Sequence, residues 1–128
     1  MAITTSAITS SFKNQLLSGT HDLDNGGDTF KLALYTDSSV IGPSLASFTT
    51  GGQVTDSTGD YSSGGKALTG QTHKLSGTTA IVDWADLSYL TATITAMGAL
   101  IYNSSKSNKS AAVLDFVSNK TSTSGTFT

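Results

Sequence analysis

Apolar residues alternate with polar or small residues along several short segments, which is the pattern of strands that bury one face. The clearest segment is 29–36, in which Phe30, Leu32 and Leu34 occupy alternate positions. Further strands are predicted at residues 66–69, 79–84, 91–103 and 111–117. The polar residues 103–109 join the last two of these, so the pattern predicts an antiparallel hairpin.

The longest predicted strand, 91–103, contains a glycine in its middle. Ile94, Leu100 and Tyr102 are expected on one side of this strand, because side chains alternate with a period of two. Gly98 is expected at a β-bulge or at a place where another backbone approaches closely.

The N-terminal segment has a different spacing. Ile8, Phe12 and Leu16 recur at every fourth position, which predicts a short amphipathic helix capped by Ser6 and ended by Gly19. Residues 1–5 are expected to form an extended arm before it. Residues 21–28, rich in Asp, Asn and Gly, are expected to form a tight turn.

Two segments give no clear periodicity. Residues 37–65 are mostly polar, with isolated apolar positions such as Val40 and Val54, and are expected to form a long loop containing one or two short strands. The Ser/Thr-rich residues 118–128 are open to two interpretations, a flexible linker or an edge strand that awaits a partner.

Composition agrees with a β-rich chain. The 128 residues are enough for one domain, which we place at residues 1–128, and the chain contains no Glu and no Arg and a single Pro, Pro43. Two strong helix formers are therefore absent. The expected fold class is all-β: a β-sandwich with jelly-roll-like antiparallel sheets and one short N-terminal helix.

Charge and cysteine content exclude several function classes. Without Arg, and with its seven Lys scattered along a chain of net charge −2, the protein is not expected to bind nucleic acid. The absence of Cys removes disulfides, thiolate nucleophiles and Cys-ligated zinc. No apolar run has the length needed to span a bilayer, so no membrane association is expected.

Candidate chemistry is sparse. His21 and His73 are the only possible bases near neutral pH, and both fall in turn-like segments. The carboxylates at residues 22, 24 and 28 loosely resemble a calcium loop, but Gly26 stands where a ligand is needed, which favours a structural turn. Asp83 and Asp86 flank Trp84 and are also interpreted as turn residues. The sequence therefore predicts no enzymatic activity, no cofactor and no metal.

Four segments, taken together, resemble a known group of proteins: residues 29–36 (TFKLALYT), 61–68 (YSSGGKAL), 94–103 (ITAMGALIYN) and 112–116 (AVLDF). They are similar to small tailed-bacteriophage virion proteins, some of which resemble capsid cement, or decoration, proteins. Met97 stands where the group has a basic residue. Similar proteins continue beyond the position of Thr128 through a final strand, so a neighbour is expected to complete the sheet.

The resemblance implies a structural role. A cement protein binds the outer surface of the shell of major capsid proteins and stabilises the DNA-filled head, so the expected location is the virion, after synthesis in the host bacterial cytoplasm. The expected partners are the major capsid protein and other copies of the chain, as a dimer or trimer. The residues expected to make these protein contacts are Ile3, Ile8, Phe12 and Phe127.

Two other functions stay open at this point. A phage tail, adaptor or fibre component would explain the same composition and the same resemblance. A receptor- or glycan-binding module is the second alternative, for which exposed rings of Tyr61, Trp84 and Tyr89 would form a flat binding platform.

Overall fold

A computed structural model describes residues 3–37, 41–55 and 59–128, and it confirms the all-β class. Within these residues the secondary structure consists of strands and one short helix. Their bounds are β1 (Ala7–Ile8), α1 (Ser10–Leu17), β2 (Phe30–Tyr35), β3 (Lys66–Ala67), β4 (Thr72–Ser76), β5 (Thr79–Asp83), β6 (Tyr89–Asn103) and β7 (Lys109–Phe127).

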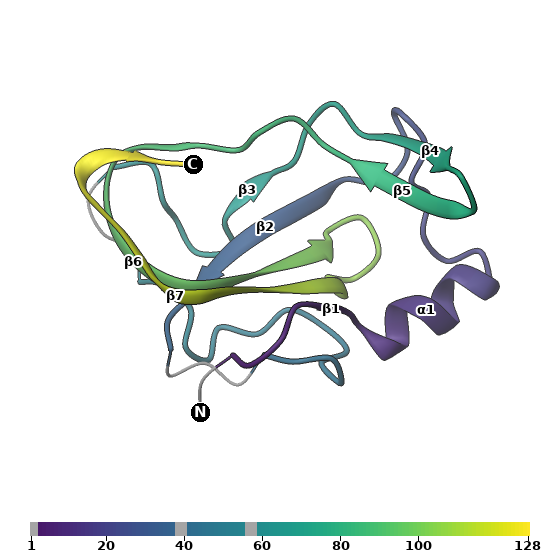
Figure 1. Cartoon of the computed structure of the whole chain (residues 1–128), viewed down its shortest axis with the longest axis horizontal. Coiled ribbons are helices and arrows are strands. Elements are labelled where there is room, and N and C mark those ends of the chain that lie inside the picture. Colours follow the sequence, from purple (N-terminus) through teal and green to yellow (C-terminus); the bar gives the residue numbers. More distant parts are fainter. Residues whose placement is uncertain (1–2, 38–40, 56–58) are drawn as a thin grey trace.

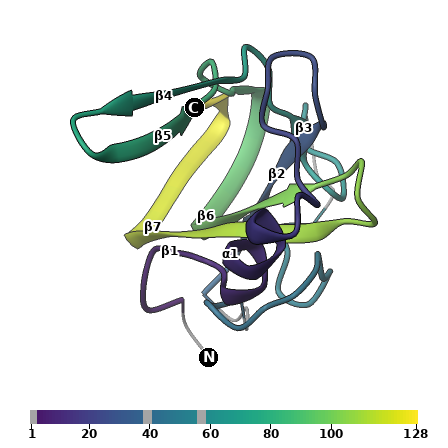
Figure 2. The same ribbon diagram turned by 90° about the vertical axis from the view of Figure 1, so that its right-hand side faces the viewer.

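The strands form two antiparallel sheets. The larger has five strands in the order β1-β7-β6-β2-β3, and the smaller is the two-stranded β4–β5 hairpin. The long β6–β7 hairpin is strongly bent, so that its far half, which ends at the C-terminus, rises away from the half beside β2 (Figures 1 and 2). The β4–β5 hairpin projects away from the larger sheet (Figure 2). The two antiparallel sheets are compatible with a sandwich-like fold.

The pairing of β6 with β7 is interrupted at the predicted bulge. The pairing register shifts between Ala96 and Gly98, and a Cβ on Gly98 would lie 2.4 Å from the carbonyl oxygen of Leu114. Only glycine fits there. The expectation that Ile94, Leu100 and Tyr102 share one side is wrong, because the bulge reverses the alternation: Ile94 packs in one core cluster, and Leu100 and Tyr102 pack in another.

The helix starts later than its spacing predicts. Ser6 does not cap it: its hydroxyl accepts the backbone N–H of Asp115 at 2.8 Å. The next two residues, Ala7 and Ile8, pair with Val113 and Ala112 of β7. They therefore form a strand where the first turn of the helix was expected. The predicted end is confirmed, since Gly19 follows the helix with a φ of 71°.

The strand predicted at 29–36 and the 103–109 hairpin connection are both confirmed. β2 pairs with β6 from Phe30↔Asn103 to Tyr35↔Gly98, and β6 continues into β7 through the polar turn. However, β2 is not half-buried along its length, because Ala33, Leu34 and Tyr35 are all buried. Its end is therefore covered on both faces.

The long loop accounts for this double coverage. Its described residues form no named strand, only the isolated bridges Tyr35↔Gln53 and Ser47↔Lys109. Ile41 and Val54 are buried on opposite sides of β2, in different core clusters. The loop thus supplies core residues in place of strands, while Val40 lies outside the described residues.

Besides β1, two further strands differ from the expectations drawn from the sequence. β4 has no counterpart among the predicted strands, and β7 extends ten residues beyond 117, as far as Phe127. Of the two interpretations of the Ser/Thr-rich tail, the structure supports the edge strand: it pairs with β6 as far as Tyr89↔Phe127. On its other side β1 reaches only Ala112 and Val113, and in the described part of the chain no other strand pairs there.

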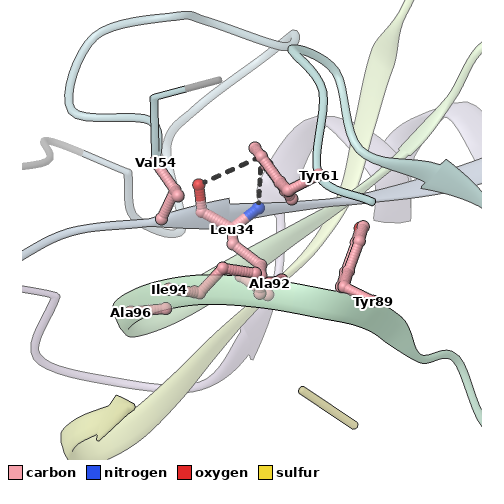
Figure 3. Close-up of a cluster of buried hydrophobic side chains, with 8 residues drawn as sticks. Leu34, Val54, Tyr61, Tyr89, Ala92, Ile94 and Ala96 are labelled. Atoms are coloured by element: carbon pink, nitrogen blue, oxygen red, sulfur yellow. Dashed lines mark hydrogen bonds between the residues drawn. The ribbon is translucent and has the colours of Figure 1, made fainter. Parts of the chain in front are cut away.

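The core cluster inside the bent hairpin is built around Leu34 (Figure 3). The Tyr61 hydroxyl accepts the backbone N–H of Leu34 at 3.0 Å, and the Tyr61 and Tyr89 rings lie 5.0 Å apart between centroids. The Tyr89 hydroxyl donates to the Leu32 carbonyl oxygen at 2.6 Å. Both tyrosines therefore bury their rings while satisfying their hydroxyl groups.

Candidate protein-binding grooves

An apolar groove lies between α1 and the β4–β5 hairpin, and we call it the helix–hairpin groove. Its volume is about 300 Å³. It is lined by Ile8, Phe12, Leu16, Leu23, His73, Lys74, Leu75, Ala80, Ile81 and Val82. The groove is apolar and open, which is the usual character of a surface that another protein covers.

Several of its side chains are exposed although they are large and apolar. The exposed fraction is 53% for Ile8, 42% for Leu16 and 72% for Leu75. Phe12 is buried and forms part of the floor. Ile8 is positioned by its pairing with Ala112, and Phe12 and Leu16 by the helix that follows. Together the three residues form one wall of the groove.

The opposite wall, the β4–β5 hairpin, is held at its base. The indole N–H of Trp84 donates to the Gln71 side-chain oxygen at 2.9 Å, and the Gln71 amide donates to the Asp24 carbonyl oxygen at 2.8 Å. His73 lies 2.5 Å from the Asp24 carboxylate. The hairpin base is therefore tied to the 21–28 turn.

His21 joins the helix to the sheet beneath the groove. The amide of Asn103 donates to His21 Nδ1 at 2.9 Å and to Asp28 at 2.8 Å. With Nδ1 accepting, Nε2 carries the proton and donates to the Gln15 side-chain oxygen at 2.8 Å. The His21 ring also packs on Phe12, with 4.5 Å between ring centroids. Neutral His21 satisfies this network completely.

Burial lowers the pKa of His21 below its usual value of 6.5, with Asp28 opposing and Lys109 and Lys106 reinforcing the effect. The unfolded chain therefore binds a proton at a higher pH than the folded one, and stability falls as pH drops below about 6.5. Urea unfolding across this range should show that loss for the wild type. His21→Gln should flatten it. An unchanged slope in His21→Gln would contradict this assignment.

A second apolar recess lies inside the bend of the β6–β7 hairpin, and we call it the C-terminal hollow. Its volume is about 430 Å³. It is lined by Leu32, Leu34, Leu68, Asp83, Trp84, Ala85, Asp86, Leu87, Tyr89, Ile101, Leu114, Phe116, Phe127 and Thr128. Nearly all of these residues are apolar, and the carboxylates of Asp83 and Asp86 are exposed.

The four residues expected to make protein contacts are divided between these surfaces and the core. Ile8 is exposed in the helix–hairpin groove, and Phe127 lines the C-terminal hollow. Ile3 is only 2% exposed and packs with Leu100 and Val113, so the N-terminal arm is anchored in the core at this residue. Phe12 is buried as well. Ile3 and Phe12 therefore stabilise the fold from the interior of this chain.

The glycan platform does not form. Tyr61 and Tyr89 are buried in the core cluster of Leu34, and only Trp84 of the three rings is partly exposed. The expectation of a flat exposed surface of three rings is therefore wrong, because the rings of Tyr61 and Tyr89 fill the inside of the bent hairpin.

The turn at residues 21–28 uses its carboxylates internally. Burial opposes ionisation of Asp28, but bonds from the backbone of Asp22, from Asn103 and from Lys106 outweigh it and lower its pKa. Asp22 accepts the backbone N–H of Asp24 at 3.0 Å, and Asp24 contacts His73. Among the described residues no three His or acidic side chains are grouped so that they could hold a metal ion.

No protein-family model, curated protein or solved structure matches the chain. Within the part of the chain that the structure describes, no helix is long and apolar enough to cross a membrane.

Proposed function

We propose that the chain is a capsid cement protein of a tailed bacteriophage, bound to the outer surface of the major capsid protein shell in the virion. The observation that carries this proposal is the helix–hairpin groove, where large apolar side chains from β1, α1 and the β4–β5 hairpin share one open surface. Contiguous apolar surface of this kind marks protein contacts. The phage-like segments found in the sequence support the same class of partner.

The groove contributes binding energy by burial. Covering a side chain such as Ile8 or Leu16 contributes about 1.5–3 kcal/mol before the entropy cost of association. One copy therefore binds modestly. Because a shell repeats the same joint many times, many such contacts together stiffen it against the pressure of packaged DNA.

The open edge of β7 offers a second kind of contact. Beyond Val113 its outer side has no strand partner among the described residues, so its backbone can accept an extended segment of a capsid subunit by β-augmentation. The edge carries Lys120 but no other charge between 118 and 127, so it has little to repel such a segment.

Charge placed in the groove should weaken attachment strongly. In Ile8→Asp a carboxylate replaces an apolar side chain that the capsid covers, which should weaken binding to emptied phage capsids at least tenfold, as measured by co-sedimentation. Leu16→Asp, on the helix, should act in the same direction.

Leu90→Asp is the matched control. Leu90 is 54% exposed, about as exposed as Ile8 at 53%, but it lies on β6 away from the groove. This variant should bind as the wild type does. Equal binding by Ile8→Asp and Leu90→Asp, with both folded by circular dichroism, would reject the groove as the capsid-binding surface.

A further inference from the structure

The C-terminal hollow combines an apolar lining with uncompensated negative charge. Asp83 and Asp86 are exposed at the hollow, and within the described ranges neither takes part in an ion pair. Among the described residues, the Asp83 carboxylate accepts one hydrogen bond, from the backbone N–H of Trp84 at 2.9 Å. An occupant that matches this surface therefore carries apolar side chains next to a cation.

The β4–β5 hairpin presents those features on a projection. Leu75 is 72% exposed near its tip, Ile81 is exposed on the opposite face, and Lys74 lies beside Leu75 with no ion-pair partner in the described part of the chain. Neither outer edge of this two-stranded ribbon pairs with another described strand. Isolated two-stranded hairpins are marginally stable in water, so contact with another surface would stabilise this one.

We propose that the tip of the β4–β5 hairpin of one copy inserts into the C-terminal hollow of a second copy. Leu75 and Ile81 enter the apolar recess, and Lys74 approaches Asp83 and Asp86 at its mouth. The projection and the recess are both present on this chain and are complementary in charge and polarity, which favours a second copy over a different protein as the occupant.

The contact is heterologous, because the hairpin of one copy meets the hollow of the next. Repeating it produces a ring if the rotation closes. This assembly goes beyond attachment to a capsid and does not require it. It uses the hairpin wall of the helix–hairpin groove and leaves the wall of Ile8, Phe12 and Leu16 to the capsid. The charged residues that test it also differ from Ile8 and Leu16, and the test contains no capsid, so failure of either proposal leaves the other standing.

Charge reversal on each side of the contact provides the test. Wild type, Lys74→Asp and Asp86→Lys are compared by sedimentation velocity over a range of concentrations. The wild type should associate, and each variant alone should associate at least tenfold more weakly, because like charges then meet at the mouth of the hollow. An equimolar mixture should regain association, because the unchanged hairpin of the Asp86→Lys variant can enter the unchanged hollow of the Lys74→Asp variant, and in the other direction the two reversed charges attract one another.

Lys13→Asp is the control, because Lys13 is an exposed lysine on α1 that lines neither the hollow nor the hairpin. It should associate as the wild type does. A wild type that stays monomeric at every concentration would overturn the proposal. Single variants that associate as the wild type does would also overturn it, as would a mixture of folded variants that does not regain association. Binding of an unrelated peptide of apolar and basic residues, without self-association, would assign the hollow to another partner.

Discussion

Replacing Gly65 with alanine is expected to destabilise the protein by about 3–5 kcal/mol, since backbone strain and overpacking add. Gly65 has a φ of +74°, and a Cβ there would lie 1.8 Å from the Leu32 carbonyl oxygen and 2.9 Å from the Ala33 Cα. Those atoms belong to the backbone of β2, which is paired on both sides and cannot shift without breaking the sheet. Urea unfolding of Gly65→Ala measures the loss directly.

Gly77→Ala separates the effect of backbone strain from the effect of overpacking. Gly77 also has a positive φ, +61°, but no atom of the described residues lies within 4 Å of the Cβ it would carry. Its substitution should cost only the left-handed backbone strain, about 1–2 kcal/mol. If Gly65→Ala lost no more stability than Gly77→Ala, the close approach of Gly65 to the backbone of β2 would be contradicted.

Leu34→Ala is the second large effect, with an expected loss of about 2–5 kcal/mol from the cavity it leaves. Leu34 is buried at the centre of the cluster that fills the bent hairpin, against Val54, Tyr61 and Ile94 (Figure 3). The Tyr61 hydroxyl bonds to the backbone of Leu34, so the substitution keeps these hydrogen bonds and removes packing alone.

The matched control is Leu90→Ala, which shortens an exposed leucine on β6 and should change the free energy of unfolding by less than about 0.5 kcal/mol. Chemical denaturation of both variants gives the comparison. Similar small losses for the two leucines would mean that the inside of the bend is loosely packed, contrary to the burial of Leu34.

Elements whose signals are local can be predicted well from the sequence. β2 shows strict alternation around Phe30, Leu32 and Leu34, and the polar 103–109 turn lies between two apolar runs, so both are assigned without tertiary information. Gly98 is also recognisable, because a glycine inside an apolar strand usually marks a bulge or the close approach of another backbone.

Elements without buried side chains escape such prediction. Every residue of β4 is exposed, so it has no hydrophobic alternation, and its strand conformation depends on pairing with β5 across Gly77. The far half of β7 is likewise polar and is held by β6. The spacing of Ile8 from Phe12 fits a helix face, whereas pairing with Ala112 makes Ile8 a strand residue.

The candidate site can be predicted only in part. Ile8 and Phe127 stand out as apolar residues near the ends of the chain, but the helix–hairpin groove exists because α1 and β4–β5, far apart in sequence, lie across from one another. The C-terminal hollow depends on the bend of β6–β7 (Figure 2). Neither arrangement follows from spacing along the chain.

Attachment of many identical copies to a phage shell is the central claim, and counting those copies tests it most directly. Purified protein is sedimented with emptied but otherwise complete capsids, and the amount bound per shell is quantified together with the shell's melting temperature. The claim predicts saturation at on the order of hundreds of copies, with a higher melting temperature, because the binding site repeats with the symmetry of the shell. Binding of a handful of copies, or of none, would contradict it and assign the protein to the tail or to a receptor-binding role.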